Sequence, residues 1–151
     1  MAVRQLLLYP GELAKLHAEP RLIASLVEEV LRFEPPVDMT GRVAPVDMDV
    51  GGCPVKATQT LTAVLRAANR DPAVYPDPHR FVIDGKRRPH LAFGGGAHIC
   101  VGAPLARLEA QVALGRLFER FPRLRLADPD APPRWRRLPL FRGLERLDVV
   151  A

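Results

Sequence analysis

The placement of proline is the feature that most restricts how this chain can fold. The sequence holds 16 prolines, and two long stretches with a helical pattern lie between them. The first stretch, residues 20–34, begins with Pro20, which suits a first helical turn, and is stopped by Pro35 and Pro36. The second stretch, residues 103–121, ends just before Pro122. We therefore expect one helix over each stretch.

The two expected helices differ in their apolar faces. The first has a single stripe at helical spacing, formed by Leu22, Leu26, Val30 and Phe33. The second is apolar on two sides, and such a helix needs neighbours on both. We therefore expect the isolated chain to expose an apolar patch along it. Its two faces consist of Leu105, Leu108 and Val112, and of Leu114, Leu117, Phe118 and Phe121.

The remaining segments predict short strands and loops. In residues 37–66, short β-branched stretches alternate with glycine and proline, which is typical of short strands and turns. Residues 68–90 include "NRDPAVYPDPHRF", whose three prolines indicate an extended, irregular connection. Residues 123–150 read as short strands again. Cys53, in the first of these segments, is expected to be a buried or half-buried thiol.

Composition and charge exclude several classes of protein. Hydrophobic residues make up 48% and charged residues 26%, as in globular domains, and 151 residues fit one domain. The chain lacks both an apolar run long enough to span a bilayer and a secretory signal, so we expect a cytoplasmic protein without membrane contact.

Two cysteines cannot form a disulfide framework, and without a CxxC pair a four-ligand zinc site is not expected. The net charge is +5, and the basic residues are spread along the chain. They form no basic motif with interleaved aromatic residues, so we expect no nucleic-acid partner.

The sequence "HLAFGGGAHICVGAPLARLEA", from His90 to Ala110, carries the strongest chemical signal. It is not a dinucleotide-binding G-x-G-x-x-G, because position 99 is isoleucine, and it lacks the Lys-Ser/Thr pair of a P-loop. Instead, it delivers Cys100 just before a helix that begins near Ala103. The free N–H groups of a helix start favour a thiolate there, which can be a nucleophile or a metal ligand. A buried structural thiol in a turn is the alternative.

Six residues in this stretch match, position for position, the heme-binding signature of the cytochrome P450 family, and the match resembles the soluble bacterial branch. They are Phe93, Gly94, Gly96, His98, Cys100 and Gly102. The chain also resembles the family in its Glu29-x-x-Arg32 pair, in Arg80, and in the meander "ANRDPAVYPDP". The resemblance implies a mainly α fold with small β-sheets (α+β), namely the C-terminal part of the P450 fold.

The resemblance also implies roles for individual residues. Cys100 would be the axial thiolate ligand of the iron of heme b, with Phe93 packed beside it. His98 and Arg42 would each bind a heme propionate, and Gly94, Gly96 and Gly102 would shape the loop. Glu29, Arg32 and Arg80 would form a structural triad that holds the loop in place.

Two departures from the family pattern matter. The N-terminal half of the family fold is not matched, including the oxygen-side helix with its acid–alcohol pair, so no catalytic residue is assigned. The isolated chain is therefore expected to be incomplete for turnover. In "CPVKATQT", the family usually has a glycine in the turn, so the shape of this turn is uncertain.

By resemblance, the chain is the C-terminal portion of a heme-thiolate monooxygenase that oxygenates a small organic substrate with O₂ and two electrons. Its expected partners are a ferredoxin-type iron–sulfur donor and a complementing N-terminal part. We also expect Arg107, and less strongly Arg116 and Arg120, to offer a cationic docking patch to that donor. Two alternatives remain: a non-catalytic P450-like partner protein or remnant that docks on another chain, and a thiol-based redox or metal protein that uses His98 and Cys100.

Overall fold

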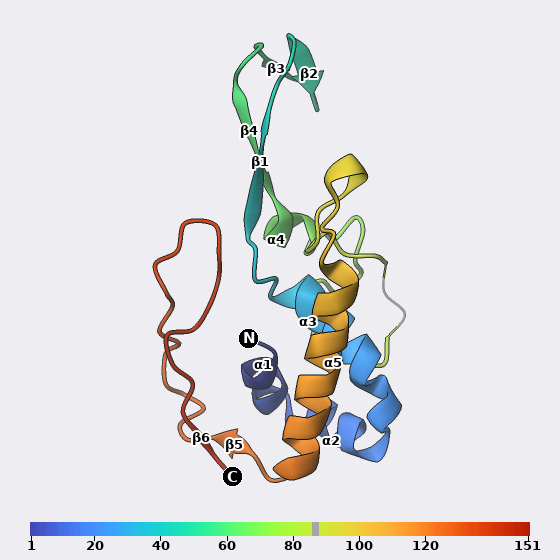
Figure 1. Cartoon of the computed structure of the whole chain (residues 1–151), viewed down its shortest axis with the longest axis vertical. Helices are drawn as coiled ribbons and strands as arrows, with labels where there is room; N and C mark the ends of the chain where they lie inside the picture. Colours follow the sequence, from blue (N-terminus) through green and yellow to red (C-terminus); the bar gives the residue numbers. More distant parts are fainter. Residues whose placement is uncertain (86–87) are drawn as a thin grey trace.

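The computed structural model describes residues 1–85 and 88–151, and it shows a helical body from which a β-hairpin region projects (Figure 1). The expected meander, residues 68–90, includes positions 86 and 87, which lie outside the described residues. The helices are α1 (Ala2–Leu8), α2 (Pro10–Ala18), α3 (Ile23–Phe33), α4 (Leu65–Ala68) and α5 (Ala103–Arg120), with the 3-10 turns η1 (Pro20–Leu22) and η2 (Gly96–His98).

Both expected long helices are present with small differences in their bounds. The stretch from residue 20 begins with η1 and continues as α3, and α5 ends at Arg120, one residue earlier than expected. Helices α1 and α2 were not predicted. They are short, and they are separated at Tyr9, where the backbone leaves the helical region before Pro10 starts α2. Segments of seven and nine residues offer too few turns for a clear apolar period.

The projecting region is built from two antiparallel strand pairs. Strand β1 (Met39–Val43) pairs with β4 (Thr60–Val64), with Met39 opposite Val64, and β2 (Met48–Val50) pairs with β3 (Cys53–Val55). The expectation for Cys53 was wrong, because its side chain is exposed. The reason is architectural: β2 and β3 form an isolated pair at the far end of the projection, where no second layer covers them (Figure 1).

The turn between β3 and β4 takes a left-handed residue without a glycine. Thr58 has a φ of 70°, and its N–H donates to the carbonyl of Ala44 at 2.8 Å. The "CPVKATQT" turn therefore places a β-branched residue in a backbone conformation that favours glycine.

The C-terminal segment has much less strand than its sequence pattern predicts. Only β5 (Arg125–Leu126) and β6 (Val149–Val150) pair with each other, and isolated bridges join Val37 to Phe141 and Trp135 to Leu144. The rest of this segment, which holds several prolines that cannot donate to a strand ladder, forms a long loop beside the helical body (Figure 1).

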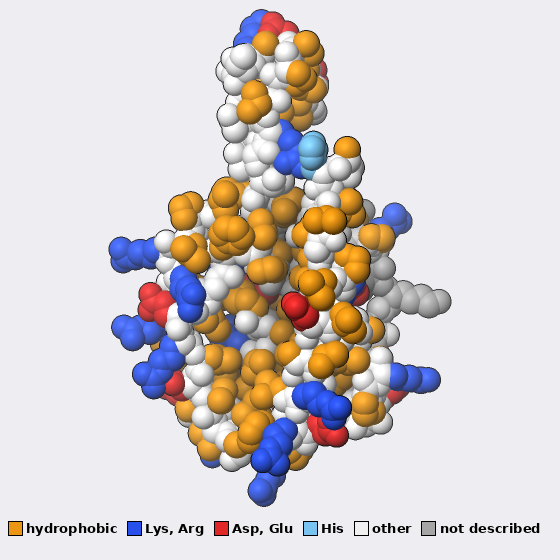
Figure 2. Space-filling view, in the orientation of Figure 1, with side chains coloured by type: hydrophobic (Ala, Val, Ile, Leu, Met, Phe, Trp, Pro, Cys, Tyr) orange, Lys and Arg blue, Asp and Glu red, His pale blue; other side chains and the backbone are white. Residues whose placement is uncertain are grey.

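The core lies where α1, α2, α3 and α5 meet the end of the meander. The predicted stripe of α3 is confirmed, because Leu26, Val30 and Phe33 are buried, and α5 contributes Leu114 and Phe118. The other face of α5 stays exposed, as expected, through Leu105, Leu108 and Val112. Figure 2 shows hydrophobic side chains gathered over the middle of the visible face. Within the described part of the chain, no helix has the length and apolarity to cross a membrane.

Candidate functional site

The glycine-rich loop wraps tightly just before α5. The N–H of Gly94 donates to the carbonyl of Leu91 at 2.8 Å, and η2 follows at once. Gly94 and Gly96 both have a φ of 74°, which side-chain-bearing residues rarely adopt, and the space where a Cβ would sit is open at both. These two glycines therefore let the loop turn twice within a few residues and keep its outer side free.

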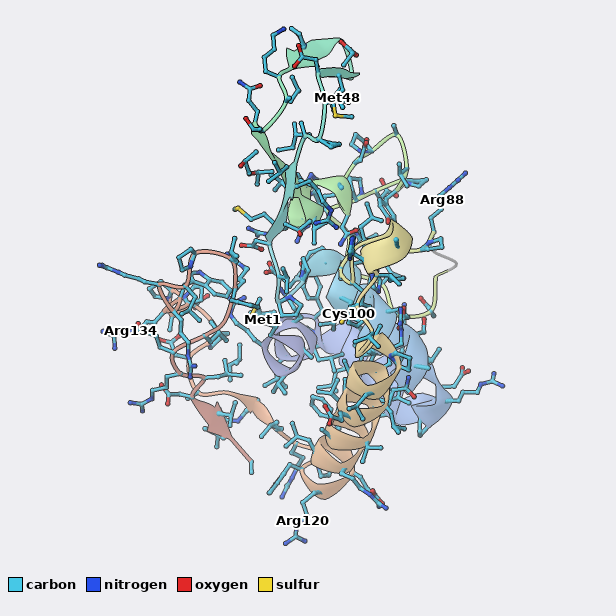
Figure 3. All side chains as sticks on the ribbon, turned by 45° about the horizontal axis from the view of Figure 1, so that its top comes forward. Met1, Met48, Arg88, Cys100, Arg120 and Arg134 are labelled. Atoms are coloured by element: carbon cyan, nitrogen blue, oxygen red, sulfur yellow. The ribbon has the colours of Figure 1, made fainter. Side chains whose placement is uncertain are left out.

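Cys100 stands at the end of this loop with its thiol exposed. Its N–H donates to the carbonyl of Phe93 at 2.9 Å, and its own carbonyl accepts from Ala103 at the start of α5. Figure 3 shows Cys100 between the helical body and the projecting hairpins. The helix start has no side-chain cap, so its free N–H groups favour a negative charge beside it.

Apolar side chains flank the thiol and face solvent. Ile99 is exposed, and Val101 is 97% exposed. Phe93 is half-buried and lies against the loop's inner side, with its ring 4.6 Å from the Arg107 guanidinium. An exposed thiol can ligate a soft metal ion, and the exposed apolar residues beside it offer an apolar surface.

Glu29 and Arg32 form a buried bidentate ion pair on α3. Arg32 is 1% exposed, and its Nε and Nη2 donate to the Glu29 carboxylate at 2.8 and 2.9 Å. Arg32 also donates to the carbonyls of Asn69, Pro78 and Arg80. The contact of Arg80 with Arg32 is therefore made by its main-chain carbonyl, and Arg80 as a whole residue is exposed.

Asn69 is a further member of this cluster that sequence reasoning missed. It is fully buried, its carbonyl accepts from Arg32, and its side-chain oxygen accepts from the N–H of Leu91 at 2.7 Å. It therefore links the ion pair directly to the start of the glycine-rich loop. The sequence offered only a weak signal, an asparagine just before "RDP" at the start of the meander.

The two expected propionate residues lie on different elements. Arg42 is exposed on β1, and its guanidinium donates to the Thr40 hydroxyl and the Gly41 carbonyl. His98 is exposed at the end of η2.

Arg107, the first residue of the expected docking patch, is paired with a carboxylate. Its Nε and Nη2 donate to Glu28 of α3 at 2.7 and 2.9 Å, and these bonds lower the pKa of Glu28 and raise that of Arg107. Arg116 pairs with Glu119 on α5 itself. The expectation overlooked these carboxylates, which offset the two positive charges.

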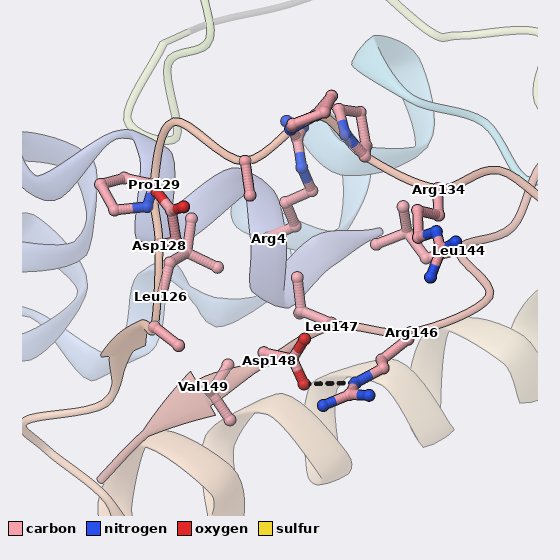
Figure 4. Close-up of a pocket in the computed structure, with 14 residues that line it drawn as sticks. Arg4, Leu126, Asp128, Pro129, Arg134, Leu144, Arg146, Leu147, Asp148 and Val149 are labelled. Atoms are coloured by element: carbon pink, nitrogen blue, oxygen red, sulfur yellow. Dashed lines mark hydrogen bonds and ion pairs between the residues drawn. The ribbon is translucent and has the colours of Figure 1, made fainter.

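A hollow lies elsewhere, between α1 and the C-terminal loop (Figure 4). It measures about 660 Å³ and mixes basic and acidic side chains, among them Arg4, Asp128, Arg146 and Asp148. None of its lining residues comes from the loop that carries Cys100.

Across residues 1–85 and 88–151, no three His, Cys, Asp or Glu side chains gather as metal ligands would.

Comparison with known proteins decides the family. The family model of cytochrome P450 matches residues 17–138. The chain belongs to the cytochrome P450 family. It is 47% identical, over 96% of its length, to the biotin biosynthesis cytochrome P450 of Bacillus subtilis, and 43% identical, over 95%, to the 6-deoxyerythronolide B hydroxylase of Saccharopolyspora erythraea.

Solved structures agree with this assignment. A crystal structure of P450BioI in complex with a hexadec-9Z-enoic acid ligated acyl carrier protein superposes with a TM-score of 0.94 at 45% identity, covering 99% of this chain. The chain spans 36% of the length of the two curated P450 relatives and 38% of that solved chain. The mixed architecture of helices and small sheets is thus a part of the P450 fold.

Cytochrome P450 proteins bind heme b, and the residues present fit that group. The loop supplies a thiol, the donor that a heme-thiolate iron needs. The open space above Gly94 and Gly96 and the exposed Ile99 and Val101 leave an apolar approach to that thiol. Nothing else among the described residues of this loop blocks the sulfur, since Cys100 is exposed.

Proposed function

We propose that the chain is the heme-binding portion of a cytochrome P450 monooxygenase, with Cys100 as the axial ligand of the heme iron. The observation that carries this proposal is the exposed thiol of Cys100 on a double-glycine loop, at the start of α5 and among exposed apolar side chains. When bound, the heme would supply the oxygen activation that inserts one oxygen atom of O₂ into a small organic substrate with two electrons.

The chain's own residues would bind and orient that group. As a thiolate, which the start of α5 favours, the Cys100 sulfur would bind the iron and donate electron density to it. Gly94 and Gly96 allow close approach, and Phe93 shields the sulfur from water on the inner side. His98 and Arg42 offer donors to the propionates. Gly102 lies beside the sulfur, since a Cβ there would lie 3.8 Å from Sγ, at ordinary van der Waals contact.

The structural triad of Glu29, Arg32 and Arg80 is proposed to hold the loop rather than to act on substrate. Its support is the chain of contacts from Arg32 through Asn69 to the N–H of Leu91, at the entrance to the loop. No catalytic residue is assigned, because the acid–alcohol pair of the family lies in the part that this chain does not match.

Turnover would need partners. We propose a ferredoxin-type iron–sulfur protein as electron donor and a complementing P450 N-terminal part to cover the exposed face of α5 and complete the substrate pocket. The relative solved with a ligated acyl carrier protein suggests carrier-bound acyl chains as one class of substrate to test. The cytoplasm stays the expected compartment.

The test is spectroscopic and uses the full chain loaded with hemin. We expect the reduced, CO-bound protein to show the red-shifted Soret band of thiolate ligation, and Cys100→Ser to lose it. Cys53→Ser is the matched control and should keep the band, because Cys53 lies on the projecting β2–β3 pair. A thiolate band that survives in Cys100→Ser would refute the assignment, and absence of heme uptake would favour the non-catalytic partner protein.

A further inference from the structure

Three side chains that the proposed function does not use meet behind the glycine-rich loop. Glu28 comes from α3, Arg107 comes from α5, and His90 comes from the irregular segment that leads into the loop. Glu28 accepts two hydrogen bonds from Arg107, at 2.7 and 2.9 Å. One of its oxygens also lies 3.2 Å from His90 Nε2, although the angle falls short of a hydrogen bond.

His90 is held in one orientation. Its side chain is 4% exposed, and its Nδ1 accepts the N–H of Ala92 at 3.1 Å. This bond leaves the proton on Nε2, which faces the Glu28 carboxylate. His90 is therefore a buried group turned toward Glu28, which connects α3 with the loop.

Phe93 lies against both basic side chains. Its ring centroid is 4.6 Å from the Arg107 guanidinium and 5.9 Å from the centroid of the His90 ring. Its carbonyl accepts the N–H of Cys100 at 2.9 Å. A displacement of Phe93 would therefore move the main chain that positions the sulfur.

The geometry points to a clamp in which Glu28, Arg107 and His90 fix Phe93 and, through the carbonyl of Phe93, the position of Cys100. The three are positioning residues, and this role rests on the proposed function only in that Cys100 is the heme ligand. The clamp is needed because Gly94, Gly95 and Gly96 leave the loop with large backbone freedom, which local turn bonds alone do not remove. The planar fork of arginine suits both tasks, since it can bind a carboxylate bidentately and stack on a ring.

The test does not need heme. It measures hydrogen exchange of the Cys100 amide by NMR in the full chain, where its bond to the Phe93 carbonyl should protect it. We expect Arg107→Ala to speed exchange of this amide at least tenfold, and Glu28→Gln, which keeps the shape of the side chain, to speed it less. Arg116→Ala is the matched control, because Arg116 lies on the same helix in an ion pair with Glu119 that does not touch the loop.

A double-mutant cycle separates a clamp from a general loss of stability. If Arg107 acts through Phe93, then Arg107→Ala should add little to the exchange rate in a Phe93→Leu background. Exchange of amides within α3 should stay unchanged in every variant. The clamp is overturned if the Cys100 amide of the parent exchanges like a free peptide, if Arg116→Ala has the same effect as Arg107→Ala, or if the two substitutions add fully. Each of these results leaves the Cys100→Ser heme spectrum, and with it the proposed function, to be decided separately.

Discussion

At the scale of single residues, the chain places a residue with a side chain in the left-handed backbone conformation that favours glycine. Thr58 is the example in the turn between β3 and β4, with its φ of 70°. A left-handed conformation costs an ordinary residue about 1–2 kcal/mol, because the Cβ approaches the following carbonyl. The hydrogen bond from Thr58 N–H to the Ala44 carbonyl holds the residue there, and any residue except proline can make that bond.

We therefore expect Thr58→Gly to stabilise the chain by roughly 0.5–1 kcal/mol, because relief of strain exceeds the added entropy of the unfolded chain. The free energy of unfolding in urea measures this gain. Thr62→Gly, on the neighbouring strand β4, is the control and should destabilise by roughly 0.5–1 kcal/mol, since it has no strain to relieve. Equal losses in both variants would contradict the strain argument.

At the scale of elements, the link between α3 and the glycine-rich loop depends on a buried histidine. Burial lowers the pKa of His90 below its ordinary value of 6.5, and this effect outweighs the nearby Glu28, which acts in the opposite direction, while Arg107 adds to the lowering. The folded chain therefore keeps His90 neutral at a pH where the unfolded chain already protonates it. By linkage, its contribution to stability is complete above about pH 6.5 and is lost as the pH falls through the lower, folded pKa.

The expected result is a free energy of unfolding that falls between pH 7.5 and 5.5, with a smaller fall in His90→Gln. Urea titrations at the two pH values provide the measurement. The reading would be wrong if His90→Gln kept the full pH dependence of the parent.

Elements also show what could be predicted from the sequence. The 3.6-residue period of Leu26, Val30 and Phe33 identified α3, and the six-residue signature located the loop, because both are local patterns. The pairing of Glu28 with Arg107 joins residues 79 apart, and no local pattern carries it. For the same reason the partner of Arg107 was not predicted, and Cys53 was wrongly expected to be buried or half-buried, since burial depends on which layers cover a strand.

At the scale of the whole molecule, one buried ion pair joins three segments that lie far apart in the sequence. Arg32 reaches Glu29 on its own helix and the carbonyls of Asn69, Pro78 and Arg80, while Glu29 also accepts the N–H of Val82 at 3.0 Å. Helix α3, the end of α4 and the meander thus share one charged centre. Removal of either partner would leave an uncompensated buried charge.

We expect Glu29→Ala to destabilise the whole chain by about 3–5 kcal/mol, whether or not heme is bound. Thermal and urea unfolding of the apo chain measure this loss. Glu119→Ala is the matched control: it also removes a carboxylate three residues from an arginine on a helix, but in an exposed pair, so it should cost under about 1 kcal/mol. Similar losses in the two variants would show that burial of the pair contributes nothing.

The long C-terminal loop has a different consequence, which concerns the order of events in folding. Arg142 donates to Glu34 across 108 residues, and its N–H donates to the Pro36 carbonyl. Closing so long a stretch of chain costs more entropy than forming the local helices and hairpins, so these contacts should form late in refolding. They should also be among the first to open in the native state, because they are few. The C-terminal loop should then detach from the helical body by local unfolding while the segment around Cys100 keeps its hydrogen bonds.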